Sequence, residues 1–112
     1  MNNVAGYTRA QLVNAYDTAA RCRVWFDQIA GVFDAVLTLS APGEAPRART
    51  QGDNTLNRDW TLLHVPCINI PVGLGPNRMP IGLTLTGPRY SDRRLLAVAA
   101  ALADALADRV TR

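Results

Sequence analysis

Two short apolar runs joined by a turn constrain the fold of this chain more than any other feature. Residues 67–72, CINIPV, and 81–86, IGLTLT, each place an apolar side chain at every second position, the period of a strand that buries one face. Between them, GLGPNR at 73–78 holds glycine, proline and asparagine, and a strand follows it rather than a helix. This pattern predicts a hairpin turn, not a phosphate-binding loop.

Helical patterns flank the hairpin at both ends of the chain. Within the N-terminal region 1–30, we expect a helix from about 9 to 30, because TRAQ at 8–11 is a capping-box sequence and Gly31 is a favoured residue after a helix end. At the other end, Ser91 precedes an apolar-periodic stretch that predicts a last helix over about 92–109.

The middle of the chain predicts a strand, an irregular loop and a short helix. FDAVLTL at 33–39 is typical of a strand covered on both faces. Residues 40–54 hold two prolines, two glycines and several charges, and loops of this length in compact domains are commonly functional. A short helix is expected over 54–65, with Asn54 as its cap and Pro66 as its stop.

The element order α-β-α-β-β-α predicts an α/β fold with a small, partial mixed sheet. Strands 33–39 and 67–72, joined through the short helix, are expected to form a right-handed parallel crossover. The strand at 81–86 is expected to pair antiparallel with 67–72. Such a sheet has open edges, which favour pairing with further chain.

Composition excludes several classes of function. All twelve basic residues are arginine, so the chain has no lysine for a lysine-dependent mechanism. The arginines are scattered among acidic residues with few aromatics, which argues against a nucleic-acid surface. The longest apolar run, LLAVAAALA at 95–103, is about half the length that spans a membrane. With no secretory leader visible at Met1, we expect a cytoplasmic protein.

The only histidine, His64, lies three positions before Cys67 and raises the question of a catalytic pair. Pro66 separates the two, with one at a helix end and the other at a strand start, so their side chains need not converge. Cys22 and Cys67 are not spaced as metal ligands, and both are expected to act as small core residues.

Residues 50–96 resemble the C-terminal segment of the amidase signature family. The resemblance is carried by HVPCINIPVG, the following turn, PIGLTLTGP and SDRRLL, and upstream by FDAVLTLSAPGEAP. Order and spacing match over roughly residues 31–103. Two positions differ from the family's pattern. Thr84 stands where the family often has a glutamine in this strand, and His64 stands where many members have a small residue. The resemblance implies that residues 1–112 are a single partial domain, the C-terminal portion of an amidase fold.

The family's enzymes hydrolyse carboxylic amides with a lysine and two serines, one of them in a glycine- and serine-rich loop, and need no cofactor. None of those catalytic residues matches a position in this sequence. By resemblance, the substrate's polar end would meet Asp53 or Asn54, with Asn57 and Trp60 next along the chain. The alternative is that the first two cap the helix and Trp60 packs in the core.

Three functional hypotheses follow. The first is the C-terminal fragment of an amidase, from a truncated or split gene and inactive alone. The second is a non-catalytic subunit that docks through its sheet edge on a partner carrying the N-terminal amidase portion. The third is a small binding module. The expected partners are further copies of the chain or the missing N-terminal portion, with no nucleic acid, membrane, metal or cofactor.

Overall fold

A computed structural model describes residues 5–46 and 52–110. Residues 1–4, 47–51 and 111–112 lie outside the described residues, and with them part of the predicted region 1–30 and of the predicted loop 40–54. The element order is α1 (Arg9–Ala30), β1 (Val36–Leu39), α2 (Arg58–Leu63), β2 (Cys67–Leu74), β3 (Pro80–Thr86) and α3 (Asp92–Val110). The predicted α/β class and the order α-β-α-β-β-α are therefore confirmed.

The three strands form one sheet in the order β1-β3-β2. Both neighbouring pairs are antiparallel, so β1 and β2 run in the same direction with β3 between them. The predicted antiparallel hairpin is confirmed, whereas no parallel strands are direct neighbours within the described residues. The reason is that β3 forms backbone hydrogen bonds with β1 along one edge and with β2 along the other, so it lies between them.

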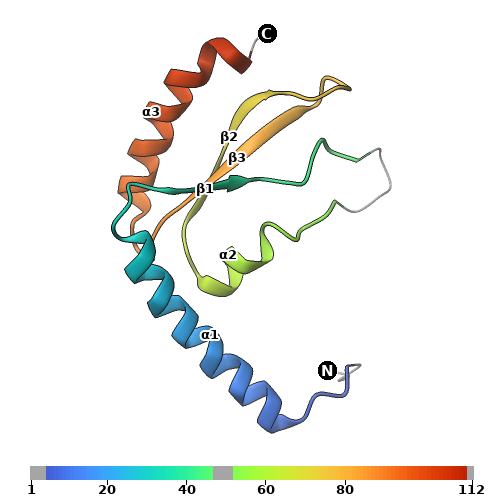
Figure 1. The fold of residues 1–112 in the computed structure, drawn as a ribbon, viewed down its shortest axis with the longest axis vertical. Helices are drawn as coiled ribbons and strands as arrows, with labels where there is room; N and C mark the ends of the chain where they lie inside the picture. The colour runs from blue at the N-terminus through green and yellow to red at the C-terminus, as the bar shows by residue number, and fades with distance from the viewer. Residues whose placement is uncertain (1–4, 47–51, 111–112) are drawn as a thin grey trace.

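One face of the sheet packs against α3, which lies alongside it (Figure 1). The pairs Ile68 with Leu85 and Ile70 with Leu83 stand opposite each other across β2 and β3, and their alternation directs them to one face. Leu85 and Leu95, from β3 and α3, are almost fully buried, and the core cluster around them consists of Ile70, Leu85, Leu95 and Ala99. This core fixes α3 on the sheet.

The observed boundaries of several elements differ from the predicted ones by a few residues. The first strand begins at Val36 and not at 33, because residues 31–34 form the turn after α1. The predicted helix 54–65 is wrong at its start: α2 is only Arg58–Leu63, with Asn57 at the cap position and no side-chain cap bond. Strand β2 continues past Pro71 to Leu74, through an irregularity between Pro71 and Gly73, where a proline is tolerated.

Helix α1 extends away from the sheet at the end opposite the C-terminal half of α3 (Figure 1). The predicted capping box is confirmed, since Thr8 and Gln11 bond each other's backbone amides. Only Ala19 and Ala30 of this helix are buried. The radius of gyration is 17.1 Å, against about 13 Å for a compact chain of this length. The chain is therefore spread out, with its first helix little covered.

A few polar contacts hold α1 in place. Asp27 accepts hydrogen bonds from the Arg89 backbone amide at 2.8 Å and from Arg89 Nε at 2.8 Å, and Arg89 Nη2 lies 2.7 Å from Asp27 Oδ2. Desolvation raises the pKa of Asp27, but the contacts with Arg89 together outweigh it, so that pKa lies below its ordinary value. Arg23 Nε also donates to the Leu62 carbonyl of α2 at 2.8 Å.

Candidate functional site

A row of polar side chains crosses the sheet on the face opposite α3. Thr84 of β3 stands opposite Thr38 of β1 and opposite Asn69 of β2. Asn69 and Thr84 alternate with apolar positions of β2 and β3 that pack on α3, so their side chains project from the other face. Thr38 lies on the same face because it is paired with Thr84. Alternation in the sequence therefore gives the sheet one apolar and one polar face around Thr84.

Ser40, Asn69 and Thr84 form a closed hydrogen-bond network on this polar face. The Ser40 hydroxyl donates to Asn69 Oδ1 at 3.0 Å, and the Thr84 hydroxyl donates to the same oxygen at 2.5 Å. The two hydroxyl oxygens lie 3.1 Å apart. Thr84 is 1% exposed, so its hydroxyl needs these partners to offset the loss of water.

The network is connected to the start of α2 and to the central strand. Asn57 Nδ2 donates to the Ser40 carbonyl at 2.8 Å, and the Ser40 amide donates to the Gly82 carbonyl at 3.0 Å. A Cβ at Gly82 would lie 3.1 Å from Ser40 Oγ, so the glycine allows this close approach. Ser40 is therefore held by both of its backbone polar groups beside Asn69.

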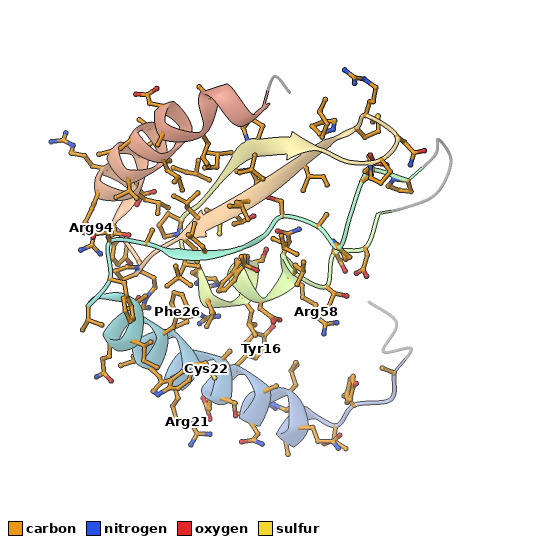
Figure 2. All side chains as sticks on the ribbon, turned by 45° about the horizontal axis from the view of Figure 1, so that its top comes forward. Tyr16, Arg21, Cys22, Phe26, Arg58 and Arg94 are labelled. Carbon is orange, nitrogen blue, oxygen red and sulfur yellow. The ribbon has the colours of Figure 1, made fainter. Side chains whose placement is uncertain are left out.

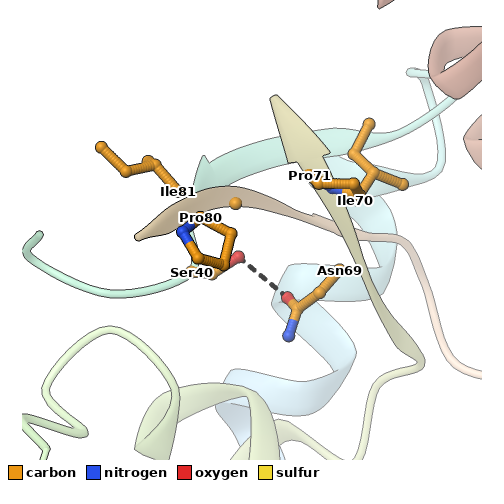
Figure 3. Close-up of a pocket in the computed structure, with 7 residues that line it drawn as sticks. Ser40, Asn69, Ile70, Pro71, Pro80 and Ile81 are labelled. Atoms are coloured by element: carbon orange, nitrogen blue, oxygen red, sulfur yellow. Dashed lines mark hydrogen bonds between the residues drawn. The ribbon is translucent and has the colours of Figure 1, made fainter. Parts of the chain in front are cut away.

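A hollow of about 260 Å³ opens beside this network (Figure 3). Ser40 and Asn69 provide its polar groups, and the rings of Pro71 and Pro80 contribute apolar walls. Gly82 also lines it, together with Ile70 and Ile81. No charged side chain of the described residues lines the hollow, so it suits an uncharged polar group.

The structure brings two of the four residues expected to bind substrate together, because Asn57 and Trp60 line a common hollow. Asp53 Oδ1 accepts from the Thr55 amide at 2.8 Å. Hydrogen bonding to the Thr55 side chain, and then to this amide, lowers the pKa of Asp53. The Asn54 carbonyl accepts from the amides of Asn57 and Arg58 at 2.9 and 3.1 Å. Asp53 and Asn54 thus shape the turn before α2, and neither caps the helix as the alternative interpretation expected. Among the four, Asn57 bonds the Ser40 network.

Trp60 packs between α2 and α1. Its ring centroid lies 5.7 Å from that of Phe26, at an interplanar angle of 55°, and Phe26 points from α1 toward α2 whereas Arg21 points away (Figure 2). The Trp60 indole Nε1 is buried without a hydrogen-bond partner among the described residues. Trp60 therefore contributes mainly packing between the two helices.

His64 and Cys67 line one hollow of about 270 Å³ together with Asn57 and Trp60. The Cys67 thiol contacts the Val65 carbonyl, with the sulfur 4.0 Å from the oxygen. Partial desolvation raises the pKa of Cys67, which disfavours the thiolate that a nucleophile requires. His64 ends α2 in a left-handed backbone conformation with φ of 57°. The two residues therefore lie near each other because the chain turns there from α2 into β2.

The prediction that both cysteines are core residues is wrong, since Cys22 and Cys67 are exposed. Cys22 lies on a helix that the rest of the described chain hardly covers, and Cys67 lies on the edge strand β2. Within residues 5–46 and 52–110, no group of three or more histidine, cysteine, aspartate or glutamate side chains could hold a metal ion. No helix in the same ranges is long and apolar enough to cross a bilayer.

Ser40, Asn69 and Thr84 were missed as site residues from sequence. The available signal was the polar residue at the middle of each apolar strand run, Asn69 in CINIPV and Thr84 in IGLTLT. Alternation places such residues on the opposite face but does not say whether they meet. Ser40 lies 29 and 44 positions from its two partners, a proximity that only the folded chain provides.

Comparisons with known proteins reveal similarity to amidase-type enzymes. A glutamyl-tRNA(Gln) amidotransferase subunit of Maricaulis maris (strain MCS10) is 31% identical over 108 residues, covering 89% of this chain and 22% of that protein. Indoleacetamide hydrolase of Agrobacterium vitis is 48% identical over 42 residues, covering 38% of this chain and 9% of that protein. No protein-family model matches the chain.

The fold matches part of a solved amidase. A crystal structure of an amidase superposes with a TM-score of 0.79 over 91% of this chain and 26% of its own, at 24% sequence identity. The predicted resemblance to a C-terminal amidase segment is confirmed by these matches. The chain spans about a fifth of the length of the amidotransferase protein that it matches.

Proposed function

Because this chain has the sequence pattern and the fold of the C-terminal region of amidase signature proteins, we propose that it is a framework segment of an amidase and has no catalytic centre of its own. The observation that carries the proposal is the unequal coverage: 89% of this chain aligns with 22% of the Maricaulis maris protein. The lysine and the glycine-serine loop that the family uses would come from a separate segment.

The exposed apolar surface supports a missing partner. Several large side chains of α1 lie open to solvent, including Trp25 at 64% and Tyr16 at 65% exposure. On β1, Leu37 and Leu39 are about half exposed. At roughly 25 cal/mol per Å² of apolar area, covering such surface would contribute several kcal/mol, which is comparable to the stability of a small domain.

The same surface predicts self-association of the chain on its own. Sedimentation velocity at several concentrations should give species heavier than 12.1 kDa, with a weight-average mass that rises with concentration. Replacing the exposed Trp25 by serine should reduce this association. A single monomeric boundary across the whole concentration range would contradict the proposal that α1 and β1 are docking surfaces.

The decisive experiment compares the chain alone with the chain joined to its upstream segment. The DNA before Met1 is translated in all forward frames and searched for a lysine and a glycine-serine loop. If a frame contains them, both polypeptides are expressed and ammonia release from a panel of amides is measured. We expect hydrolysis only by the joined polypeptide.

Two results would overturn the proposal. Hydrolysis by the chain alone, which persists through successive purification steps at constant specific activity, would show a catalytic centre within the chain. Absence of any suitable frame would favour the alternative of a separate binding module. A useful negative control is the joined polypeptide with its lysine replaced by alanine, which should release no ammonia.

A further inference from the structure

The hairpin turn between β2 and β3 holds a carboxylate. The Asn77 backbone amide donates to Glu44 Oε1 at 2.8 Å, and the Asn77 side chain donates from Nδ2 to Oε2 at 2.6 Å. The Met79 amide donates to the same Oε1 at 3.3 Å. Three donors of the turn therefore converge on both oxygens of one carboxylate, although Glu44 lies 33 positions from Asn77 in the sequence.

The backbone of the turn explains this convergence. The Arg78 amide donates to the Gly75 carbonyl and the Gly75 amide donates to the Met79 carbonyl, both at 2.9 Å. Arg78 is left-handed, with φ of 60°, a conformation typical of the last residue in a three-residue hairpin loop. A left-handed residue in a turn directs the amides on either side of it toward one point, and such a nest of amides binds anions. Asn77 and Met79 supply the two amides that flank Arg78.

Gly75 provides the space in which the carboxylate lies. A Cβ at this position would overlap Glu44 Oε1 and the Glu44 carboxyl carbon, so only a glycine leaves room for a carboxylate beside the two amides. Residues 76–79 are exposed, so a ligand can reach the turn from solvent. Arg78 is the one charged residue between Gly75 and Met79, and its positive charge favours an anion over a neutral ligand.

We propose that this turn is a carboxylate-binding site and that Glu44 is its internal ligand. An external carboxylate binds in the same way, with one oxygen on the amides of Asn77 and Met79 and the other on Asn77 Nδ2. A tethered ligand acts at an effective concentration of roughly millimolar or above, so an external carboxylate has to compete with Glu44. The loop after β1 is thus attached to the hairpin by an exchangeable contact.

Two sources can supply the external carboxylate, namely a small carboxylic acid in solution and an acidic side chain of a segment that lies against the turn. The binding chemistry requires this chain alone. Only the choice of source rests on the proposed function, because the joined upstream segment is the one that would carry such a side chain.

The test is a ¹⁵N NMR titration of the full Glu44→Ala chain with sodium acetate, which replaces sodium chloride so that the ionic strength stays constant. We expect saturable shifts of the Asn77 and Met79 amides and of the Asn77 side-chain NH₂. The original chain should need at least about tenfold more acetate, because Glu44 competes. Acetamide has a similar shape and no charge, and should not produce these shifts. Equal affinities of the two chains for acetate, or equal responses to acetate and acetamide, would overturn the proposal.

Three further substitutions in the Glu44→Ala chain separate binding from folding, with the Met79 amide as the readout. Gly75→Ala places a methyl group where the carboxylate lies, and should abolish saturable binding while the hairpin stays paired. Asn77→Ala removes one of the three donors and should weaken binding about tenfold. Arg78→Gly keeps the left-handed conformation without the charge, and should bind within about fivefold of the Glu44→Ala chain. Undiminished binding by the Gly75→Ala variant, with its strand resonances intact, would refute the site.

The same titration of the joined polypeptide, also carrying Glu44→Ala, identifies the source. If an acidic side chain of the upstream segment occupies the turn, the amides of Asn77 and Met79 are already shifted and do not respond to acetate. If the site takes a small carboxylic acid, acetate binds both polypeptides alike. Failure of the joined polypeptide to hydrolyse amides would refute the proposed function but leave the acetate result on the shorter chain unaffected.

Discussion

The two halves of the molecule are stabilised in different ways. The sheet and α3 share a core in which Leu85 and Leu95 are almost fully buried. The helices α1 and α2 meet through one aromatic contact and a hydrogen bond from the Arg23 side chain to the Leu62 carbonyl, and α1 is joined to the sheet side by the Asp27–Arg89 ion pair. The first half has a buried core, although Leu37 and Leu39 of β1 are about half exposed, whereas the second half leaves most of its apolar residues exposed.

This difference indicates which half needs a partner. Hydrophobic burial supplies most of the free energy of folding, and the sheet with α3 contains the buried core cluster of the described residues. Directional polar contacts position α1 but cannot cover Trp25 or Tyr16, both of which are largely exposed. The first half therefore provides the scaffold, and α1 together with the exposed side chains of β1 provides the surface that a partner would cover.

Leu85→Ala should produce the largest effect, because it opens a cavity in the one well-packed core of the described chain. The expected loss in the free energy of unfolding is about 2–5 kcal/mol, measured by urea denaturation with circular dichroism. Leu62→Ala, at a half-exposed position of α2, is the matched control and should change the free energy of unfolding by less than about 0.5 kcal/mol. Equal losses would show that both halves depend on the same core.

Asp27→Ala should release α1 while leaving the sheet folded. The pair is only about a quarter exposed on each side, so loss of its charged hydrogen bonds should cost about 1–3 kcal/mol. Hydrogen exchange should speed up at the C-terminal turns of α1 but not in β3. Asp17→Asn on the same helix is the control and should leave exchange unchanged. Uniformly faster exchange across the sheet would contradict independent halves.

Acid should release the same contact gradually. The folded-state pKa of Asp27 lies below its ordinary value, so the stabilisation is complete above about pH 4 and is lost as pH falls through the lowered value. The Arg89 amide and Nε–H resonances should report this titration, and Asp27→Asn should remove it. A midpoint above pH 4 would mean that desolvation affects the pKa of Asp27 more than the contacts with Arg89 do.

Glu44→Gln should have the smallest and most local effect. Glu44 accepts from the amides of Asn77 and Met79 and from the Asn77 side chain, contacts that attach the loop after β1 to the hairpin turn. The Asn77 side-chain hydrogen bond is the main reason why the pKa of Glu44 is lowered. We expect faster amide exchange at residues 77 and 79 with an unchanged urea midpoint. Asp34→Asn, an exposed acid before β1, should leave these amides unaffected.

The local features of the fold could be predicted from neighbouring residues. The Thr8–Gln11 capping box, the end of α1 at Gly31 and the hairpin turn between β2 and β3 were all predicted correctly, because neighbouring residues decide them. The alternation in β2 and β3 also identified the face that packs on α3. The family resemblance was recoverable for the same reason, since its motifs are short and contiguous.

Contacts between distant residues could not be predicted and became apparent from the folded chain. The tertiary structure placed β3 between β1 and β2, joined Ser40 to Asn69 and Thr84, and paired Asp27 with Arg89 across 62 positions. It also exposed both cysteines. Residue type and spacing report what a side chain prefers, but burial and pairing depend on what the rest of the fold brings near it. For α1, within the described residues, little is brought near, and its apolar side chains stay open.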